Sequence, residues 1–319
     1  MNDQAIIEIT GLEKSFPVGF LGRARRPVLR RIDLEVRSNE IFGYLGPNGA
    51  GKTTTLKILM GLVRPDQGSA RILGEPLEGR SWRQRAGFLP EHPYLYDYLT
   101  AAEYLDYVGR LFGLAPRIRR DRSRELLELF GLSRSAHIPL RRFSKGMTQR
   151  VGIAQALIND PDLVFLDEPM SGLDPIGRHV VRGLIVDLKR RGKTVFFSTH
   201  ILSDAETLCD RVALLRSGQI LRVGPLDEIL EVDVAHMEVL VTGVEGSVLG
   251  CLQGVLARHP VGERWRLEVA EGELGSVLRS VEQAGGRIRS VQPVRQSLED
   301  FFFKEMAAGS VEQAWQAVD

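Results

Sequence analysis

The segment from Gly46 to Thr53 reads Gly-Pro-Asn-Gly-Ala-Gly-Lys-Thr and fits the phosphate-binding pattern G-x-x-x-x-G-K-[ST]. Its glycines permit turns with positive φ and let the backbone approach a ligand closely. Successive N–H groups at a helix N-terminus then direct partial positive charge at phosphates. In this pattern the lysine reaches the β- and γ-phosphates and the hydroxyl ligates Mg²⁺. We therefore predict that a nucleoside triphosphate is bound here by Asn48, Gly49, Gly51, Lys52, Thr53 and Thr54, with Thr53 also on the metal.

Two carboxylates follow a second apolar run. Leu163–Leu166 predicts a buried parallel strand, and Asp167 and Glu168 come at its carboxyl end, where α/β sheets place their ligands. We predict that Asp167 helps to hold Mg²⁺ and that Glu168 orients or deprotonates an attacking water. The alternative interpretation is an ordinary solvated strand end.

Two further side chains are candidates for the same site. His200 follows the apolar run Thr194–Phe197, so it can hydrogen-bond the γ-phosphate or the attacking water if this strand ends in the same crevice; a lone histidine at a strand end is otherwise structural. Phe16 precedes the phosphate loop by two predicted strands. Its ring can stack on a purine, or it can pack against the protein and so hold the basic segment between Phe16 and Pro27 in place. That segment is predicted to be a loop or hairpin.

The elements that must position these residues alternate between strands and helices. Apolar patterning predicts the strand Ile41–Leu45 before the phosphate loop and the helix Thr54–Met60 after it. Other strands are predicted at Ile6–Ile9, Ile32–Val36, Gly68–Leu73 and Ala86–Leu89, with a hairpin formed by Arg211–Leu215 and Gln219–Val223.

A helical insertion is predicted over about 92–158. Thr100 and Glu103 match a capping box that opens a helix to about Leu111. Arg124–Phe130 predicts a second amphipathic helix, and Ser144 is placed as the N-cap of a third.

The pattern changes near residue 231, so we predict an α/β nucleotide-binding domain over 1–230 and a small α+β domain over 231–319. In the second domain Glu238–Val241, Arg264–Val269 and Arg287–Val294 alternate like strands. Helices are predicted at Val248–Leu256, Leu274–Ala284 and Leu298–Met306. No catalytic constellation is recognisable there.

Composition narrows the class of protein. The 319 residues are 43% hydrophobic and carry a net charge of +1, so no overall basic field recruits nucleic acid or acidic lipid. No run approaches the roughly 18 apolar residues of a membrane span, and the first residues lack a signal-peptide pattern. Cys209 and Cys251 lack metal-ligand spacing, which favours buried thiols in a reducing compartment. We expect a cytoplasmic protein.

The order of these motifs resembles the ATP-binding subunits of ABC transporters over about the first 230 residues, which implies a P-loop NTPase fold of the ABC type that uses ATP and Mg²⁺. The resemblance implies a role for each matching position, as follows: Phe16 stacks on adenine, Gly46–Thr53 is the Walker A loop, Glu91 stands at the Q-loop, Ser144 and Gly146 belong to the signature motif, Asp167 is the Walker B aspartate, Glu168 is the catalytic glutamate, Asp174 is the D-loop aspartate, and His200 is the switch histidine.

Two motifs depart from the family pattern. The usual signature Leu-Ser-Gly-Gly-Gln is replaced by Phe143-Ser144-Lys145-Gly146-Met147, which adds a cation where phosphate would lie. The usual Q-loop glutamine is Glu91, whose carboxylate can ligate Mg²⁺ or position water but adds negative charge beside the triphosphate. Both features, with the C-terminal domain, resemble exporter ATPases whose permeases are separately encoded.

The resemblance implies a homodimer in which ATP lies between the Walker A loop of one copy and the signature helix of the other. It also implies a separate membrane permease and a peripheral location on the cytoplasmic face of the membrane. Tyr94, Tyr96, Tyr98 and Tyr104 lie where this family docks its permease, although core packing explains them equally well. The competing function is an ABC-type ATPase that acts on nucleic acid or ribosomes, which a second cassette, a long coiled coil or a basic stripe would favour.

Overall fold

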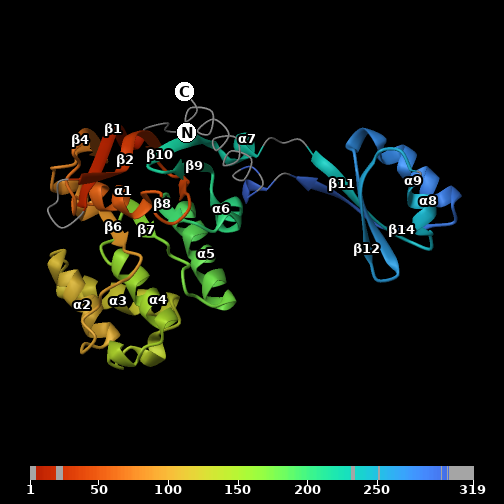
Figure 1. Ribbon diagram of the computed structural model, residues 1–319. Helices are drawn as coiled ribbons and strands as arrows, with labels where there is room; N and C mark the ends of the chain where they lie inside the picture. The colour runs from red at the N-terminus through yellow and green to blue at the C-terminus, as the bar shows by residue number, and fades with distance from the viewer. Residues whose placement is uncertain are drawn as a thin grey trace. The chain divides into compact units, whose positions relative to one another are not determined.

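The computed structural model describes residues 5–18, 24–230, 234–250, 252–295, 297–299 and 301. The chain divides into a first unit, Met1–Leu226, and a second unit, Asp227–Asp319 (Figure 1). The predicted boundary was at about residue 230. The assignment of 1–230 as a nucleotide-binding domain and of 231–319 as an accessory domain stays a prediction.

A six-stranded sheet forms the centre of the first unit, in the order β10-β9-β3-β8-β7-β6. Its strands are β3 (Ile41–Leu45), β6 (Ala86–Leu89), β7 (Leu163–Asp167), β8 (Thr194–Thr199), β9 (Arg211–Arg216) and β10 (Gln219–Pro225). The neighbours from β9 to β6 pair in parallel, and β10 pairs with β9 antiparallel. Every residue of β3, β7 and β8 is buried, as apolar strands covered on both faces require. The α/β fold predicted from the sequence is confirmed.

A second, antiparallel sheet has the order β2-β1-β4-β5. It contains β1 (Ala5–Val18), β2 (Ala24–Arg37), β4 (Gln67–Ile72) and β5 (Glu75–Pro76). The two long strands β1 and β2 pair as a hairpin, in which Phe16 lies opposite Arg26. The sequence predicted only the inner parts of these strands, because their outer ends are largely exposed and lack alternating apolar residues.

Helices surround the central sheet. They are α1 (Lys52–Leu59), α5 (Pro175–Arg190) and α6 (Leu202–Leu208), with 3-10 turns at Ser81–Arg85, Ser133–Ser135 and Leu140–Arg142. The short α7 (Leu226–Ile229) stands at the boundary between the two units. The insertion contains α2 (Ala101–Leu111), α3 (Pro116–Leu129) and α4 (Lys145–Ala156). The predicted capping box of α2 is present, with Thr100 and Glu103 each accepting a hydrogen bond from the other's backbone N–H. Helix α3 begins earlier than the predicted Arg124, because its arginine-rich first turns hide the apolar periodicity.

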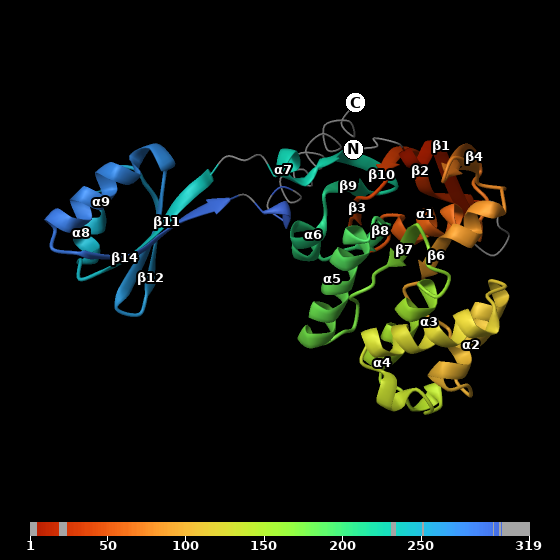
Figure 2. The same cartoon turned by 180° about the vertical axis from the view of Figure 1, so that it is seen from behind.

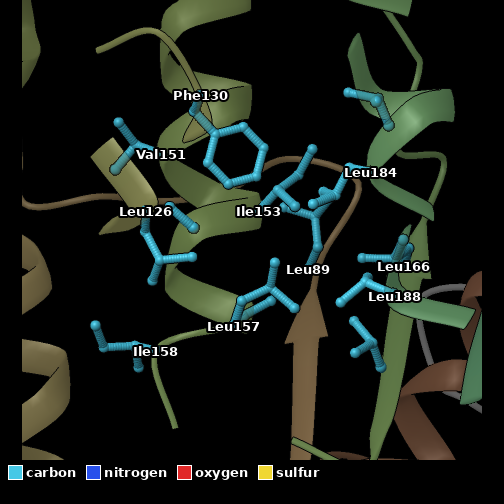
Figure 3. Packing of buried hydrophobic residues seen from close by; sticks show 14 of the residues in the cluster. Leu89, Leu126, Phe130, Val151, Ile153, Leu157, Ile158, Leu166, Leu184 and Leu188 are labelled. Carbon is cyan, nitrogen blue, oxygen red and sulfur yellow. The ribbon is translucent and has the colours of Figure 1, made fainter. Parts of the chain in front are cut away.

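Two apolar cores lie on the two faces of the central sheet. Because side chains alternate along a strand, Val164 and Leu166 of β7 belong to one core while Leu163 and Phe165 belong to the other. The first core continues into the insertion, where side chains from α3, α4 and α5 meet the strand end of β6 (Figure 3). This shared core fixes α4 against the sheet. Cys209 packs against it, and burial raises the pKa of its thiol.

The second unit has the element order βαββαβ. It contains β11 (Val234–Thr242), α8 (Gly246–Gly250), β12 (Val255–Val261), β13 (Arg264–Val269), the 3-10 turn Glu271–Glu273, α9 (Leu274–Gln283) and β14 (Arg287–Arg295) (Figure 2). Its sheet is antiparallel with the order β12-β13-β11-β14, the arrangement of ferredoxin-like folds.

One prediction in this unit is wrong. The helix expected over Val248–Leu256 ends at Gly250, and β12 begins at Val255. The chain turns at Gly254, whose φ is 80°, and Val255 then pairs with Val269. The apolar run therefore belongs to two elements. Cys251 and most of the helix predicted over Leu298–Met306 lie outside the described residues, although 298, 299 and 301 are helical.

No helix in the described part of the chain combines the length and the apolar character that a membrane crossing needs.

Candidate functional site

Four neighbouring strands of the central sheet end at one edge, and each carries a predicted site residue. The phosphate loop follows β3, His200 follows β8, Asp167 closes β7 and Glu91 follows β6. Because these strands are adjacent and parallel, their carboxyl ends meet there.

The phosphate loop has a shape that glycine alone permits at two positions. Gly51 has a φ of 110°, and an added Cβ would lie 2.6 Å from the Leu29 side chain. A Cβ on Gly46 would lie 2.3 Å from the backbone oxygen of Leu215. The loop therefore passes close to the neighbouring backbone and leads directly into α1, whose N-terminal N–H groups suit an anion.

Lys52 is folded into this loop. Its Nζ donates to the Gly46 carbonyl at 2.7 Å and to the Pro47 carbonyl at 3.3 Å. It also lies 3.3 Å from Oε1 of Glu168, and both side chains are buried. This ammonium is thus a buried charge whose partners are oxygens at the mouth of the loop.

The candidate ligands for Mg²⁺ lie together. Thr53 Oγ1 donates to Asp167 Oδ1 at 3.3 Å, and Asp167 is buried. Burial raises the pKa of Asp167, hydrogen bonds from Ser198 and Thr53 lower it, and the nearby carboxylates of Glu91 and Glu168 raise it further. A buried carboxylate beside a hydroxyl is a hard oxygen donor set of the kind that Mg²⁺ prefers.

Among the described residues no group of three or more histidine, cysteine or acidic side chains is arranged to hold a metal ion.

Glu168 lies between two cationic or polar partners. Its Oε2 accepts from Nδ1 of His200 at 2.9 Å, while its Oε1 faces Lys52. Its backbone has a φ of 50°, a left-handed conformation that is uncommon outside glycine. The structure therefore brings the three predicted catalytic side chains Lys52, Glu168 and His200 into contact.

Ser198 links both carboxylates and was not predicted as a site residue. Its hydroxyl donates to Asp167 Oδ1 at 2.6 Å and accepts from the backbone N–H of Glu168 at 3.1 Å. Ser198 lies directly opposite Asp167 in the register of β8 and β7. The only sequence signal for it is a small hydroxyl at a strand end.

A hollow of about 810 Å³ opens over this edge of the sheet, and we call it the larger hollow. The predicted residues that line it are Phe16, Asn48, Gly49, Gly51, Lys52, Thr53, Thr54, Glu91 and Glu168. Phe16 is 38% exposed, and Lys14 Nζ lies 5.5 Å from its ring centre, so the ring is not packed into a core. Arg26, Arg30 and Ser217 also line the hollow and were not predicted as site residues. The only sequence signal for the arginines was the basic character of the hairpin.

The remaining predicted residues lie elsewhere. Ser144, Gly146 and Asp174 line a separate, smaller hollow of about 330 Å³, and none of them lines the larger one. Ser144 caps α4 by accepting from the Met147 N–H at 3.3 Å, and Asp174 caps α5 by accepting from the Gly177 N–H at 2.7 Å. One chain thus presents these residues in two separate hollows.

The tyrosines divide into two kinds. Tyr104 is buried and donates to Gln155 at 2.5 Å, so core packing explains it. Tyr94, Tyr96 and Tyr98 are exposed, and the ring centres of Tyr96 and Tyr98 lie 6.0 Å apart. Tyr96 also packs edge-on against Tyr104 and Tyr107, whereas Tyr94 and Tyr98 are mostly exposed.

Comparison with known proteins places the chain in a family. Residues 29–171 match the ABC transporter family model. An ABC transporter ATP-binding protein of Nostoc sp. is 45% identical, over 96% of this chain and 91% of that protein. A fluoroquinolones export ATP-binding protein of Mycobacterium tuberculosis is 41% identical, over 72% of this chain and 73% of that protein. The Nod factor export ATP-binding protein I of Ralstonia nicotianae is 36% identical, over 81% and 78%.

Solved structures agree with these relatives. An ATP-binding subunit of an ABC transporter superposes with a TM-score of 0.63 at 34% identity, over 70% of this chain and 91% of that one. A dimeric ATP-binding cassette in a post-hydrolysis state with ADP and phosphate gives 0.63 at 27% identity, over 69% and 98%. On the evidence of its fold, its strand-end residues and these relatives, the chain belongs to the ATP-binding subunits of ABC transporters and is an ATPase of that family.

Proposed function

We propose that two copies of this chain close head to tail on two ATP molecules, and that hydrolysis reopens them to drive export through a separate membrane permease. The observation that carries this proposal is the separation of the larger hollow from the smaller one within a single chain. In a head-to-tail pair, Ser144 and Gly146 of one copy complete the hollow of the other. ATP then favours the closed pair because it contacts both copies only in that state.

Within each site we assign the phosphates to the loop and to Lys52, and the purine to the exposed face of Phe16. Arg26 and Arg30, which line the same hollow, add positive charge for the triphosphate. The glycine conformation at Gly51 and the buried Lys52 support this assignment.

A Mg²⁺ ion held here would supply positive charge that neutralises the bound phosphates. Thr53 and Asp167 are the residues that fit it, and Glu91 lines the same hollow. Lys52 must leave Glu168 to reach a phosphate, which frees one carboxylate oxygen to accept a proton from water or to orient it. His200 holds the other oxygen and so fixes the direction of the carboxylate.

Export through a separate permease rests on the relatives. The Nod factor and fluoroquinolones proteins are named for export, which favours transport over an action on nucleic acid or ribosomes. We place the chain at the cytoplasmic face of the cell membrane, with the exposed Tyr94, Tyr96 and Tyr98 as the surface for the permease.

The test is ATP-dependent pairing of the Glu168→Gln variant, measured by light scattering. Glutamine keeps the shape of the side chain but cannot act as a base, so turnover should fall by about 10²-fold or more while ATP binding stays. With ATP and Mg²⁺ the variant should therefore accumulate as a dimer. The matched control Glu128→Gln, on the exposed face of α3, should hydrolyse ATP like the parent.

A variant that binds ATP yet remains monomeric at every protein concentration would count against pairing by ATP. Unchanged hydrolysis would remove Glu168 from its assigned role.

A further inference from the structure

A second pocket, of about 540 Å³, lies in the helical insertion, far along the chain from the phosphate loop. It is bounded by α2, by α3 and by the turn around residues 133–137, and α2 and α3 lie side by side in both views (Figures 1 and 2). None of the residues that line it lines the larger or the smaller hollow. The proposed ATP site therefore does not use this pocket.

One stripe of α3 forms the main wall of this pocket. The stripe consists of Pro116, Arg120, Ser123, Arg124 and Leu127, whose spacing places them on one face of a helix. Arg120 and Arg124 are four residues apart, and like charges at that spacing destabilise a helix. The two exposed arginines therefore give this wall of the pocket a local excess of positive charge.

The charges around this pocket do not balance. The carboxylate of Asp106 in α2 accepts hydrogen bonds from Nε of Arg110 at 2.8 Å and from Nε of Arg119 at 2.7 Å. Arg120 and Arg124 form no ion pair or side-chain hydrogen bond with any described residue. The pocket thus has guanidinium groups whose donors are available to a ligand.

Ser123 adds an unsatisfied polar group to the same wall. The residue is 7% exposed, and its hydroxyl has no hydrogen-bond partner among the described residues. A buried hydroxyl without a partner is costly unless something bonds to it. Ser123 lies between the two arginines along the helix, but its Oγ has essentially no exposed surface and is closed to a ligand in this conformation.

We propose that this pocket binds a small anion with two or more charges on phosphate or carboxylate groups. The planar forks of Arg120 and Arg124 match the paired oxygens of such groups. The anionic group belongs either to a soluble molecule or to the headgroup of an acidic lipid.

The test is calorimetric titration of inorganic pyrophosphate into the full chain, with ADP saturating the phosphate loop and magnesium omitted. The double variant Arg120→Gln/Arg124→Gln should weaken pyrophosphate binding at least tenfold, because charge-assisted hydrogen bonds are lost. The control variant Arg117→Gln/Arg134→Gln removes two charges from the same insertion but from outside the pocket. It should change the affinity less than twofold.

Three results would overturn the proposal: no pyrophosphate binding by the parent chain, equal binding by the double variant, or an equal loss in the control. Sedimentation with acidic phospholipid vesicles identifies the source of the anion. Loss of vesicle binding in the pocket variant alone assigns the site to a lipid headgroup. Equal vesicle binding in all three chains, together with the tenfold pyrophosphate effect, assigns it to a soluble ligand.

Discussion

At the scale of single residues, the candidate site is a network of buried charges that hold one another in place. Glu168 is contacted by Lys52 on one oxygen and by His200 on the other, while Asp167 is held by Thr53 and Ser198. Such a network is stable only when every member has a partner. Replacing one member should therefore disturb its neighbours in a direction that the contacts predict.

Asp167 should reveal a trade-off between stability and function. Because burial raises its pKa, the folded protein binds this proton more tightly than the unfolded chain does. The stability that comes from this group is present below the pKa of the unfolded chain, and it is lost as the pH rises through the folded pKa. Asp167→Asn should therefore raise the thermal midpoint of the nucleotide-free protein near about pH 7.5, and the gain should shrink toward about pH 4.

The same variant should lose Mg²⁺-dependent hydrolysis, because the amide is a poor ligand for the metal. The measurement is a set of melting curves across this pH range beside a Mg²⁺ titration of ATPase activity. A midpoint that falls at neutral pH would show that the negative charge stabilises the apo fold.

Ser198 should act on stability and catalysis together. Ser198→Ala removes the hydroxyl that serves both Asp167 and the Glu168 N–H, so we expect a loss of about 1–3 kcal/mol of unfolding free energy. Turnover should fall while ATP affinity changes less, since the loop itself is untouched. Denaturant titration and ATPase kinetics measure both. Ser203→Ala, at an exposed position of α6, should stay within about 0.5 kcal/mol of the parent.

The phosphate-loop residues could be predicted because they are contiguous in the sequence and together match one known phosphate-binding pattern. The role of Ser198 could not, since it depends on the register that places it opposite Asp167. Arg26 and Arg30 were missed for the same kind of reason: their place in the site follows from how the hairpin folds over the loop.

At the scale of elements, the site depends on a loop that must turn sharply between β3 and α1. Gly51→Ala should place a Cβ against Leu29 at a φ of 110°, which costs about 1–3 kcal/mol in backbone strain and should abolish ATP binding. Gly183→Ala is the matched control. It lies exposed in α5 with open space around its Cα, so the exchange should stabilise the protein by about 0.5–1 kcal/mol.

Chemical denaturation measures the unfolding free energy of the two glycine variants, and a nucleotide-binding assay measures their affinity for ATP. If Gly51→Ala bound ATP with the affinity of the parent chain, the close approach of the loop to Leu29 would not matter for the site.

The strands of the parallel sheet could be predicted because continuous apolar runs of this length end at turn residues, as Ile41–Leu45 and Leu163–Leu166 do. The start of α3 could not, because arginines occupy its first turns without an apolar stripe. The mistaken helix over Val248–Leu256 shows the limit of short apolar runs, which fit a helix or a strand until a turn such as Gly254 is known.

At the scale of the whole molecule, the central proposal is that one chain carries two halves of a site. Composition and motif order predicted the family, and the structure placed the phosphate loop and the Ser144 motif in separate hollows. No pattern along the chain encodes this separation. It arises because α4 is fixed by the core of the insertion, while the loop is fixed by the sheet.

The most direct test of the two-copy site is complementation between two inactive chains. Lys52→Ala removes the lysine from the loop but leaves the Ser144 motif intact, and Ser144→Arg does the reverse. In a head-to-tail pair of unlike chains, one site contains both intact halves. Mixtures should therefore hydrolyse ATP, with a maximum near equal proportions. Activity equal to the weighted sum of the two inactive chains at every ratio would contradict a site shared between copies.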